Sequence, residues 1–190
     1  MENEINVEEL VAAAKVDKTK FVALYDLYFD AIYRYLLTRL GEVGLAEDLT
    51  AETFLIALNK LDGYTWTGKP FIAWLYKIAL NELRQHFRSK KSEMAYKEKM
   101  QQFDWSADAA DHSLKTEELQ EERAQDILQV SVAFTALKVR DQDVLTLRYF
   151  EELSYEDIAN VLNTSTSNVG VKLNRALKRL SKHLTPIYND

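Results

Sequence analysis

Apolar side chains recur along this chain at steps of three and four residues, the spacing that places them on one face of an α-helix. The pattern predicts one helix in each of five ranges and two helices in a sixth. These ranges are Lys18–Leu40, Leu45–Leu61, Phe71 to about Lys91, Ile127–Leu137, Asp141–Phe150 and, with two, Leu153–Leu180. Since only five Gly and two Pro are available for turns between strands, we predict an all-α fold.

Three details of the pattern concern packing. Gly41 and Gly44 are predicted to form the turn after the first helix. Tyr149 is predicted to point inward from the Asp141–Phe150 helix, and Leu177 to lie on the apolar stripe of the last helix.

The segment Leu153–Leu180 has the strongest local signals. Ser154 and Asp157 form a capping-box pattern, Asn163 tolerates a left-handed turn, and Ser165 starts a second helix that ends in basic residues. Two short helices about three residues apart are typical of a DNA-binding helix-turn-helix. The alternative is an ordinary helical hairpin with solvated Lys and Arg side chains.

The helix that begins at Phe71 has a second, polar face. Its members follow one another at steps of four, three, four and three residues: Lys77, Asn81, Arg84, Arg88 and Lys91. A solvated face usually mixes charges, but Glu82 is the only acidic residue of this helix. A stripe of cations with one amide suits a phosphate backbone with base edges beside it.

The loop Asp62–Pro70 contains two large aromatic residues, Tyr64 and Trp66. One use for such rings is to stack on an unpaired base. Packing beneath the loop is the other interpretation, and the residues alone favour it.

Charge is distributed unevenly around a net value of −6. Leu61–Ser92 has 6 basic and 2 acidic residues and Ile158–Asp190 has 5 and 1, whereas Glu93–Asp126 has 10 acidic and 4 basic. We therefore predict two small helical domains, residues 1–92 and 126–190, joined by an acidic linker over residues 93–125. Clustered basic charge indicates nucleic-acid binding despite the acidic total.

Several classes of protein lack support. No apolar run approaches the ~18 residues of a membrane span, the N-terminus does not resemble a signal peptide, and the chain has no Cys, so we expect a cytoplasmic protein. No phosphate-binding loop, HExxH motif or nucleophile elbow occurs, and the three His residues are isolated. We therefore predict no cofactor, no metal site and no enzymatic activity, with all carboxylates on surface faces.

Three stretches together resemble the bacterial RNA polymerase sigma factors of the extracytoplasmic-function (ECF) group. LAEDLTAETFLIAL (Leu45–Leu58) is similar to the polymerase-binding helix, and PFIAWLYKIALNELRQHFRSKK (Pro70–Lys91) to the segment that melts and recognises the minus-ten element. RDQDVLTLRYFEELSYEDIANVL followed by VGVKLNRALKRL resembles the domain that recognises the minus-thirty-five element.

The resemblance implies roles for individual residues. Asp48 and Glu52 would hold core RNA polymerase, and Tyr64 and Trp66 would receive an unstacked base. Asn81 and Arg84 would contact the opened strand, with Lys77 and Arg88 on its phosphates. The recognition helix would bind promoter DNA through an outward face: Ser167, Asn168, Val171, Lys172, Asn174, Arg175 and Lys178. By family habit an anti-sigma factor is also expected.

Two departures from the family pattern matter. Ala51 replaces the usual Gln that grips polymerase, and Gly170 replaces a cation in Asn168-Val169-Gly170-Val171-Lys172. An outward Val171 could contact a thymine methyl group, so the promoter sequence is expected to be unusual. A stand-alone helix-turn-helix regulator and, from the enzyme class, a metal-dependent nucleic-acid-processing protein are the alternative hypotheses.

Overall fold

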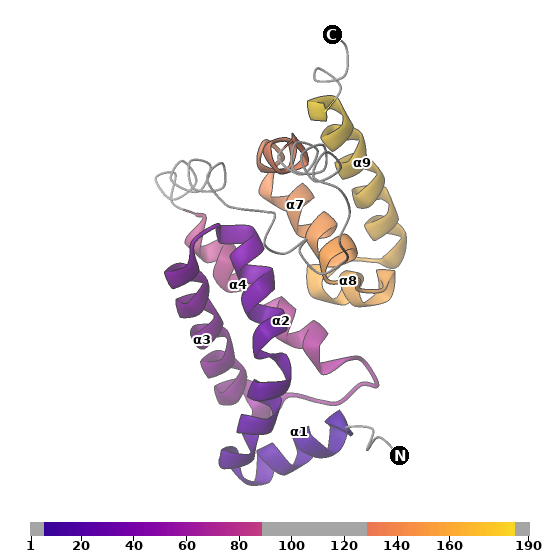
Figure 1. The fold of residues 1–190 in the computed structure, drawn as a ribbon. Coiled ribbons are helices and arrows are strands. Elements are labelled where there is room, and N and C mark those ends of the chain that lie inside the picture. The colour runs from indigo at the N-terminus through magenta and orange to yellow at the C-terminus, as the bar shows by residue number, and fades with distance from the viewer. Residues whose placement is uncertain (1–5, 89–128, 185–190) are drawn as a thin grey trace, which may run out of the picture.

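The computed structural model describes residues 6–88 and 129–184, and these residues contain helices and no β-strand (Figure 1). The predicted all-α fold is therefore confirmed. The acidic linker predicted over residues 93–125 lies outside the described residues. No helix in the described ranges is long and apolar enough to cross a membrane.

The first half is a bundle in which α2, α3 and α4 pack side by side, with α1 lying across one end (Figure 1). Its elements are α1 (Val7–Val16), the 3₁₀ turn η1 (Lys18–Phe21), α2 (Val22–Leu40), α3 (Val43–Lys60), the 3₁₀ turn η2 (Leu61–Gly63) and α4 (Phe71–His86). α4 buries Phe71, Leu75 and Leu83 completely against the bundle. Burial of this apolar face leaves the polar face of α4 directed outward.

The second half contains helical residues 129–135 and four named elements. These are α7 (Val139–Leu145), the π-helical turn η3 (Thr146–Phe150), α8 (Tyr155–Leu162) and α9 (Thr166–Leu184). Arg179 Nη1 of α9 donates to both carboxylate oxygens of Asp141 of α7, at 2.6 and 2.7 Å. This ion pair ties α7 to α9, the last helix of the chain that the structure describes.

The predicted helix-turn-helix is formed by α8 and α9. Ser154 Oγ accepts from the Asp157 backbone N–H at 3.1 Å, and Asn163 adopts the left-handed region with φ 51°. Ser165 Oγ then accepts from the Asn168 backbone N–H at 3.2 Å. Both helices thus begin at the capping residues that the sequence predicts.

Two of the packing predictions are wrong in the second half. Tyr149 is 57% exposed because the chain makes a π-helical turn there. The Glu151 N–H donates to the Thr146 carbonyl, five residues back, at 3.1 Å, which shifts the following side chains off the regular helical face. Leu177 is 38% exposed because it lies at the border of the buried α9 stripe of Val169, Leu173 and Ala176.

In the first half, the boundaries differ from prediction at three places. The helix predicted from Phe71 to about Lys91 ends at His86, and residues 87–88 form a turn. Lys18–Leu40 is divided into η1 and α2, and Gly44 lies inside α3, so Gly41 alone, with φ 63°, ends the preceding helix. Helix α1 was not predicted. The two halves pack against each other through α4 and α8, and their buried apolar residues form one continuous cluster.

Candidate nucleic-acid and polymerase interface

Lys77, Asn81 and Arg84 lie on one face of α4, as predicted, whereas Arg88 follows the end of the helix, and the four side chains are not equally accessible. Lys77, Asn81 and Arg88 are exposed. Arg84 has a side chain that is 38% exposed, and its Nη2 donates to Asp143 Oδ2 of the second half at 3.0 Å. In this arrangement Arg84 is therefore committed to a contact within the protein. Lys91 lies outside the described residues.

The two loop aromatics are packed against the first half. The Tyr64 ring lies 5.3 Å from Phe71 and 4.7 Å from Trp74, measured between centroids, and burial raises the pKa of the Tyr64 phenol. Trp66 is half-buried against the same core. Packing beneath the loop, the interpretation that the residues alone favoured, is what the structure contains.

A cleft of about 490 Å³ separates this loop from α8. Its walls combine the Trp74 ring and the Lys77 ammonium group with Asn160 of α8. Lys69 Nζ donates to Asn160 Oδ1 across the cleft. Aromatic, cationic and amide groups together suit an unpaired nucleotide, but α8 covers this side of the loop.

The proposed recognition face of α9 is mostly exposed. Its exposed members are Ser167, Asn168, Val171, Asn174, Arg175 and Lys178, and Lys172 is half-buried on the flank of the helix. Two of the amides are engaged locally, because Asn168 Nδ2 donates to Thr164 Oγ1 at 2.7 Å and Asn174 Nδ2 to the Gly170 carbonyl at 3.1 Å. Val171 is 44% exposed, so its predicted outward direction is correct.

The candidate polymerase-binding residues lie on the outer face of α3. Asp48 and Glu52 are exposed one helical turn apart, with Ala51 exposed beside them. Neither carboxylate has an ion-pair partner among the described residues. Leu55, one turn further along, is 52% exposed, so acidic and apolar groups share this face.

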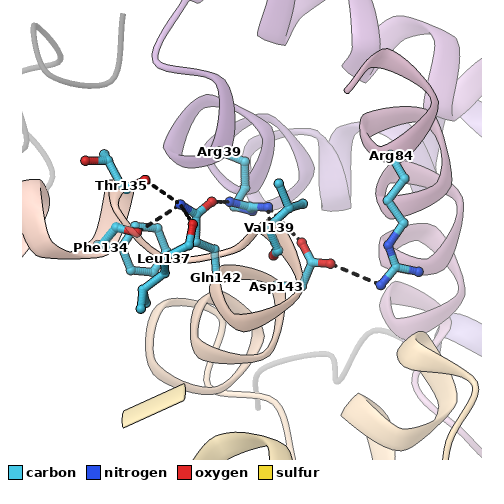
Figure 2. Close-up of polar contacts among 8 residues, drawn as sticks. All are labelled: Arg39, Arg84, Phe134, Thr135, Leu137, Val139, Gln142 and Asp143. Atoms are coloured by element: carbon cyan, nitrogen blue, oxygen red, sulfur yellow. Dashed lines mark hydrogen bonds and ion pairs between the residues drawn. The ribbon is translucent and has the colours of Figure 1, made fainter. Parts of the chain in front are cut away.

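A buried polar network joins the two halves (Figure 2). Arg39 of α2 donates through Nη2 to Asp143 Oδ1 of α7 at 2.7 Å, and both side chains are 0% exposed. Arg39 Nη1 donates to Gln142 Oε1, and Gln142 Nε2 donates in turn to the Phe134 carbonyl at 2.9 Å. Asp143 thus accepts from Arg39 and Arg84 with its two oxygens, one cation on each side (Figure 2).

Two family models match this chain, Sigma-70 region 2 over residues 24–93 and Sigma-70, region 4 over residues 127–180. The chain is also 34% identical over 169 residues to the RNA polymerase sigma factor YlaC of Bacillus subtilis, covering 85% of this chain and 90% of YlaC. It is 33% identical over 183 residues to the ECF RNA polymerase sigma factor BldN of Streptomyces coelicolor, covering 93% of this chain and 65% of BldN. The chain is an RNA polymerase sigma factor of the ECF group.

A solved structure agrees with this sigma factor in fold. The sigma factor RpoE in complex with the anti-sigma factor NepR, from Bartonella quintana, matches it with a TM-score of 0.58 and 22% identity. That match covers 87% of this chain and 96% of the other. At this identity the likeness concerns the arrangement of the helices alone.

Sequence reasoning missed the polar groups at the centre of this sigma factor. The prediction that all carboxylates lie on surface faces is wrong for Asp143, which is fully buried, and for Asp141, which is 8% exposed. Arg39 is separated from Asp143 by 104 residues, so no local spacing relates them. Lys15 of α1 was also missed, although it donates to the Tyr64 carbonyl behind the loop. The capping pair Asn6 and Glu9 could have revealed α1.

Proposed function

We propose that this sigma factor binds core RNA polymerase and directs it to promoters, with residues 1–92 and 126–190 as its two working domains and residues 93–125 as the linker. The observation that carries the proposal is the pair of separate cationic faces, on α4 and α9, in a chain matched by both sigma-region models. It acts by binding, without chemistry of its own, in the cytoplasm where polymerase works.

Each face has a proposed target. Asp48 and Glu52 of α3 bind a basic surface of polymerase. The α4 stripe and the Asp62–Pro70 loop bind the opened minus-ten strand, with Tyr64 and Trp66 receiving a base. This last step requires the rings to leave their present packing, or the base to stack on a ring face that remains exposed.

The recognition face of α9 is proposed to bind the minus-thirty-five element in the major groove. Arg175 suits a guanine edge or a phosphate, and Val171 suits a thymine methyl group. Ser167, Asn168, Lys172, Asn174 and Lys178 complete the face. Because Asn168 and Asn174 already donate within the chain, their contacts with bases need a change of side-chain rotamer.

Promoter binding requires the two halves to separate. The names of the two elements place them about 25 base pairs apart, which is about 85 Å at ~3.4 Å per base pair. A compact chain of 190 residues has a diameter of only about 40 Å, from a radius of gyration of about 16 Å. The 33 residues from 93 to 125 can span up to about 110 Å when extended, which is sufficient for both contacts at once.

The test is transcription by core polymerase with and without this protein. We would replace Lys77 and Arg88 together by Ala, since both are exposed and neither belongs to the Arg39–Asp143 network. Loss of two phosphate contacts should reduce the slope of log promoter affinity against log salt concentration by about two in magnitude. Permanganate reactivity of unpaired thymines should fall while affinity for polymerase is kept.

A matched control replaces Lys20 and Arg34, which are exposed on η1 and α2. This pair should leave both measurements unchanged. If the Lys77/Arg88 variant loses polymerase binding and strand opening equally, the stripe has a structural role. If core polymerase with the wild-type protein starts no transcript at any genomic promoter, the proposal fails, and binding of DNA without polymerase would favour a stand-alone regulator.

An anti-sigma factor is the protein partner that we infer in addition to polymerase. The support is the related RpoE, whose structure contains the anti-sigma factor NepR. Such a partner should compete with core polymerase for this chain, which a displacement titration would measure.

A further inference from the structure

A second cleft, of about 470 Å³, lies where the end of α4 meets α7, α8 and α9. Four cations line it, Arg84 and Arg88 from the first half and Arg140 and Lys172 from the second. Phe87 and Leu162 provide apolar wall between them. Its volume falls within the range of small-molecule sites, roughly 300–1,000 Å³.

The positive charge of this cleft is poorly compensated. Arg84 interacts with Asp143, but that carboxylate also accepts from Arg39. Arg88, Arg140 and Lys172 have no ion-pair partner within the described ranges. Like charges drawn together at the margin of two packed halves repel one another more strongly than they would in open solvent. An anion between them would remove this repulsion.

We propose that this cleft binds a small polyphosphorylated molecule, a chain of phosphate groups with or without a nucleoside. Arginine presents paired N–H donors that match phosphate oxygens, and Lys172 adds a compact cation from the opposite side. The apolar wall at Phe87 and Leu162 would accept the ring of a nucleoside. With or without a nucleoside, the group recognised is the phosphate chain, which bridges α4 to α7 and α9.

Such a ligand would bind only the closed arrangement, in which the two halves pack against each other as in this structure, because the cleft takes its cations from both halves. A ligand with this preference stabilises the closed arrangement by mass action. Under the proposed function it would oppose promoter binding, since Arg84, Arg88 and Lys172 are among the proposed DNA contacts. The binding itself does not depend on that function.

The experiment titrates the full-length protein with inorganic tripolyphosphate, at constant ionic strength set with NaCl, and follows its melting temperature and calorimetric binding. Arg140→Gln removes a cleft cation that is exposed and is not a proposed DNA contact. Lys182→Gln is the matched control on the exposed surface of α9. We expect binding about tenfold weaker in R140Q than in wild type and unchanged in K182Q.

Three outcomes would overturn the proposal: no binding beyond the NaCl reference, equal binding in wild type and R140Q, or equal weakening in R140Q and K182Q. The last two would mean general attraction to surface cations. A parallel titration with ATP tests the apolar wall, and tighter binding of ATP than of tripolyphosphate identifies a nucleotide. Transcription assays of wild type and R140Q without ligand separate this binding proposal from the proposed function. Absence of transcription with both proteins would refute the proposed function and leave the binding result standing.

Discussion

Replacing Asp143 by Ala should open the two halves of this sigma factor without unfolding either one. In the closed arrangement Arg39 is 0% exposed and donates to Asp143 Oδ1 at 2.7 Å. Removing the carboxylate takes a charged acceptor away from that buried cation, while Gln142 Oε1 and, at 3.4 Å, the Val139 carbonyl still accept from it. In the open arrangement water replaces the lost carboxylate, so the penalty falls on the closed arrangement alone.

The size of the effect follows from burial. Breaking one side of a buried pair costs about 3–5 kcal/mol, and the neutral acceptors that stay with Arg39 favour the lower end. The second pair, Arg84 with Asp143, adds little because the Arg84 side chain is 38% exposed. A loss of about 3 kcal/mol lowers the ratio of closed to open molecules by more than about a hundredfold.

The assay is energy transfer between fluorophores on the two halves. Because the chain has no Cys, Asn59→Cys on α3 and Lys182→Cys on α9, both exposed, provide unique labelling sites. Transfer should fall in Asp143→Ala and stay at the wild-type value in Asp30→Ala, which removes the same charge from an exposed position of α2.

Equal transfer efficiency in the Asp143→Ala and Asp30→Ala proteins would refute the reasoning. A double variant adds a second check. Arg39→Met with Asp143→Leu replaces the pair by apolar side chains of similar volume, an exchange that is often neutral or stabilising. It should therefore restore the high transfer of the closed arrangement, and failure to do so would mean that the single variant acts by disturbing α7.

Three further predictions concern single positions. Lys15→Ala removes the donor to the Tyr64 carbonyl, so the amount of open complex, measured by permanganate footprinting, should fall several-fold. The affinity for polymerase should stay unchanged, and a parallel loss of affinity would contradict this. Burial raises the pKa of the Tyr35 and Tyr76 phenols far above their usual range. The free energy of unfolding should therefore fall above about pH 10, where these tyrosines ionise in the unfolded chain but not in the folded one. Thermal melts should show a smaller fall for Tyr76→Phe. A methyl group at Gly170 would meet only a Tyr155 ring carbon at 3.7 Å. Gly170→Ala should therefore gain about 1 kcal/mol of helix propensity and raise the melting temperature by about 2–4 °C. A melting temperature below that of the wild type would reveal strain.

The parts of the fold that sequence predicts well are those set by neighbours in the chain. Ser154, Asn163 and Ser165 mark the helix-turn-helix because a side-chain cap or a left-handed turn acts within three or four residues. The outward direction of Val171 follows in the same way from helical geometry.

Prediction fails where the backbone departs from the regular helical period or where distant residues decide the outcome. The π-helical turn at Thr146–Phe150 exposes Tyr149, although the helical period through that stretch is regular. Asp143 looks like an ordinary surface acid until Arg39, 104 residues away, is brought against it. The same holds for the second cleft, whose cations come from α4 and the turn after it in the first half and from α7 and α9 in the second.

The contact between Arg84 and Asp143 has a consequence for how this protein could evolve. Under the proposed function, one guanidinium both recognises the opened strand and helps to hold the molecule shut. A substitution there that suited a new promoter would also change the fraction of molecules able to bind any promoter. A substitution at Arg84 would therefore change promoter preference and the overall level of transcription together. Promoter preference could vary by itself only through positions such as Val171, which is exposed and has no role in the network.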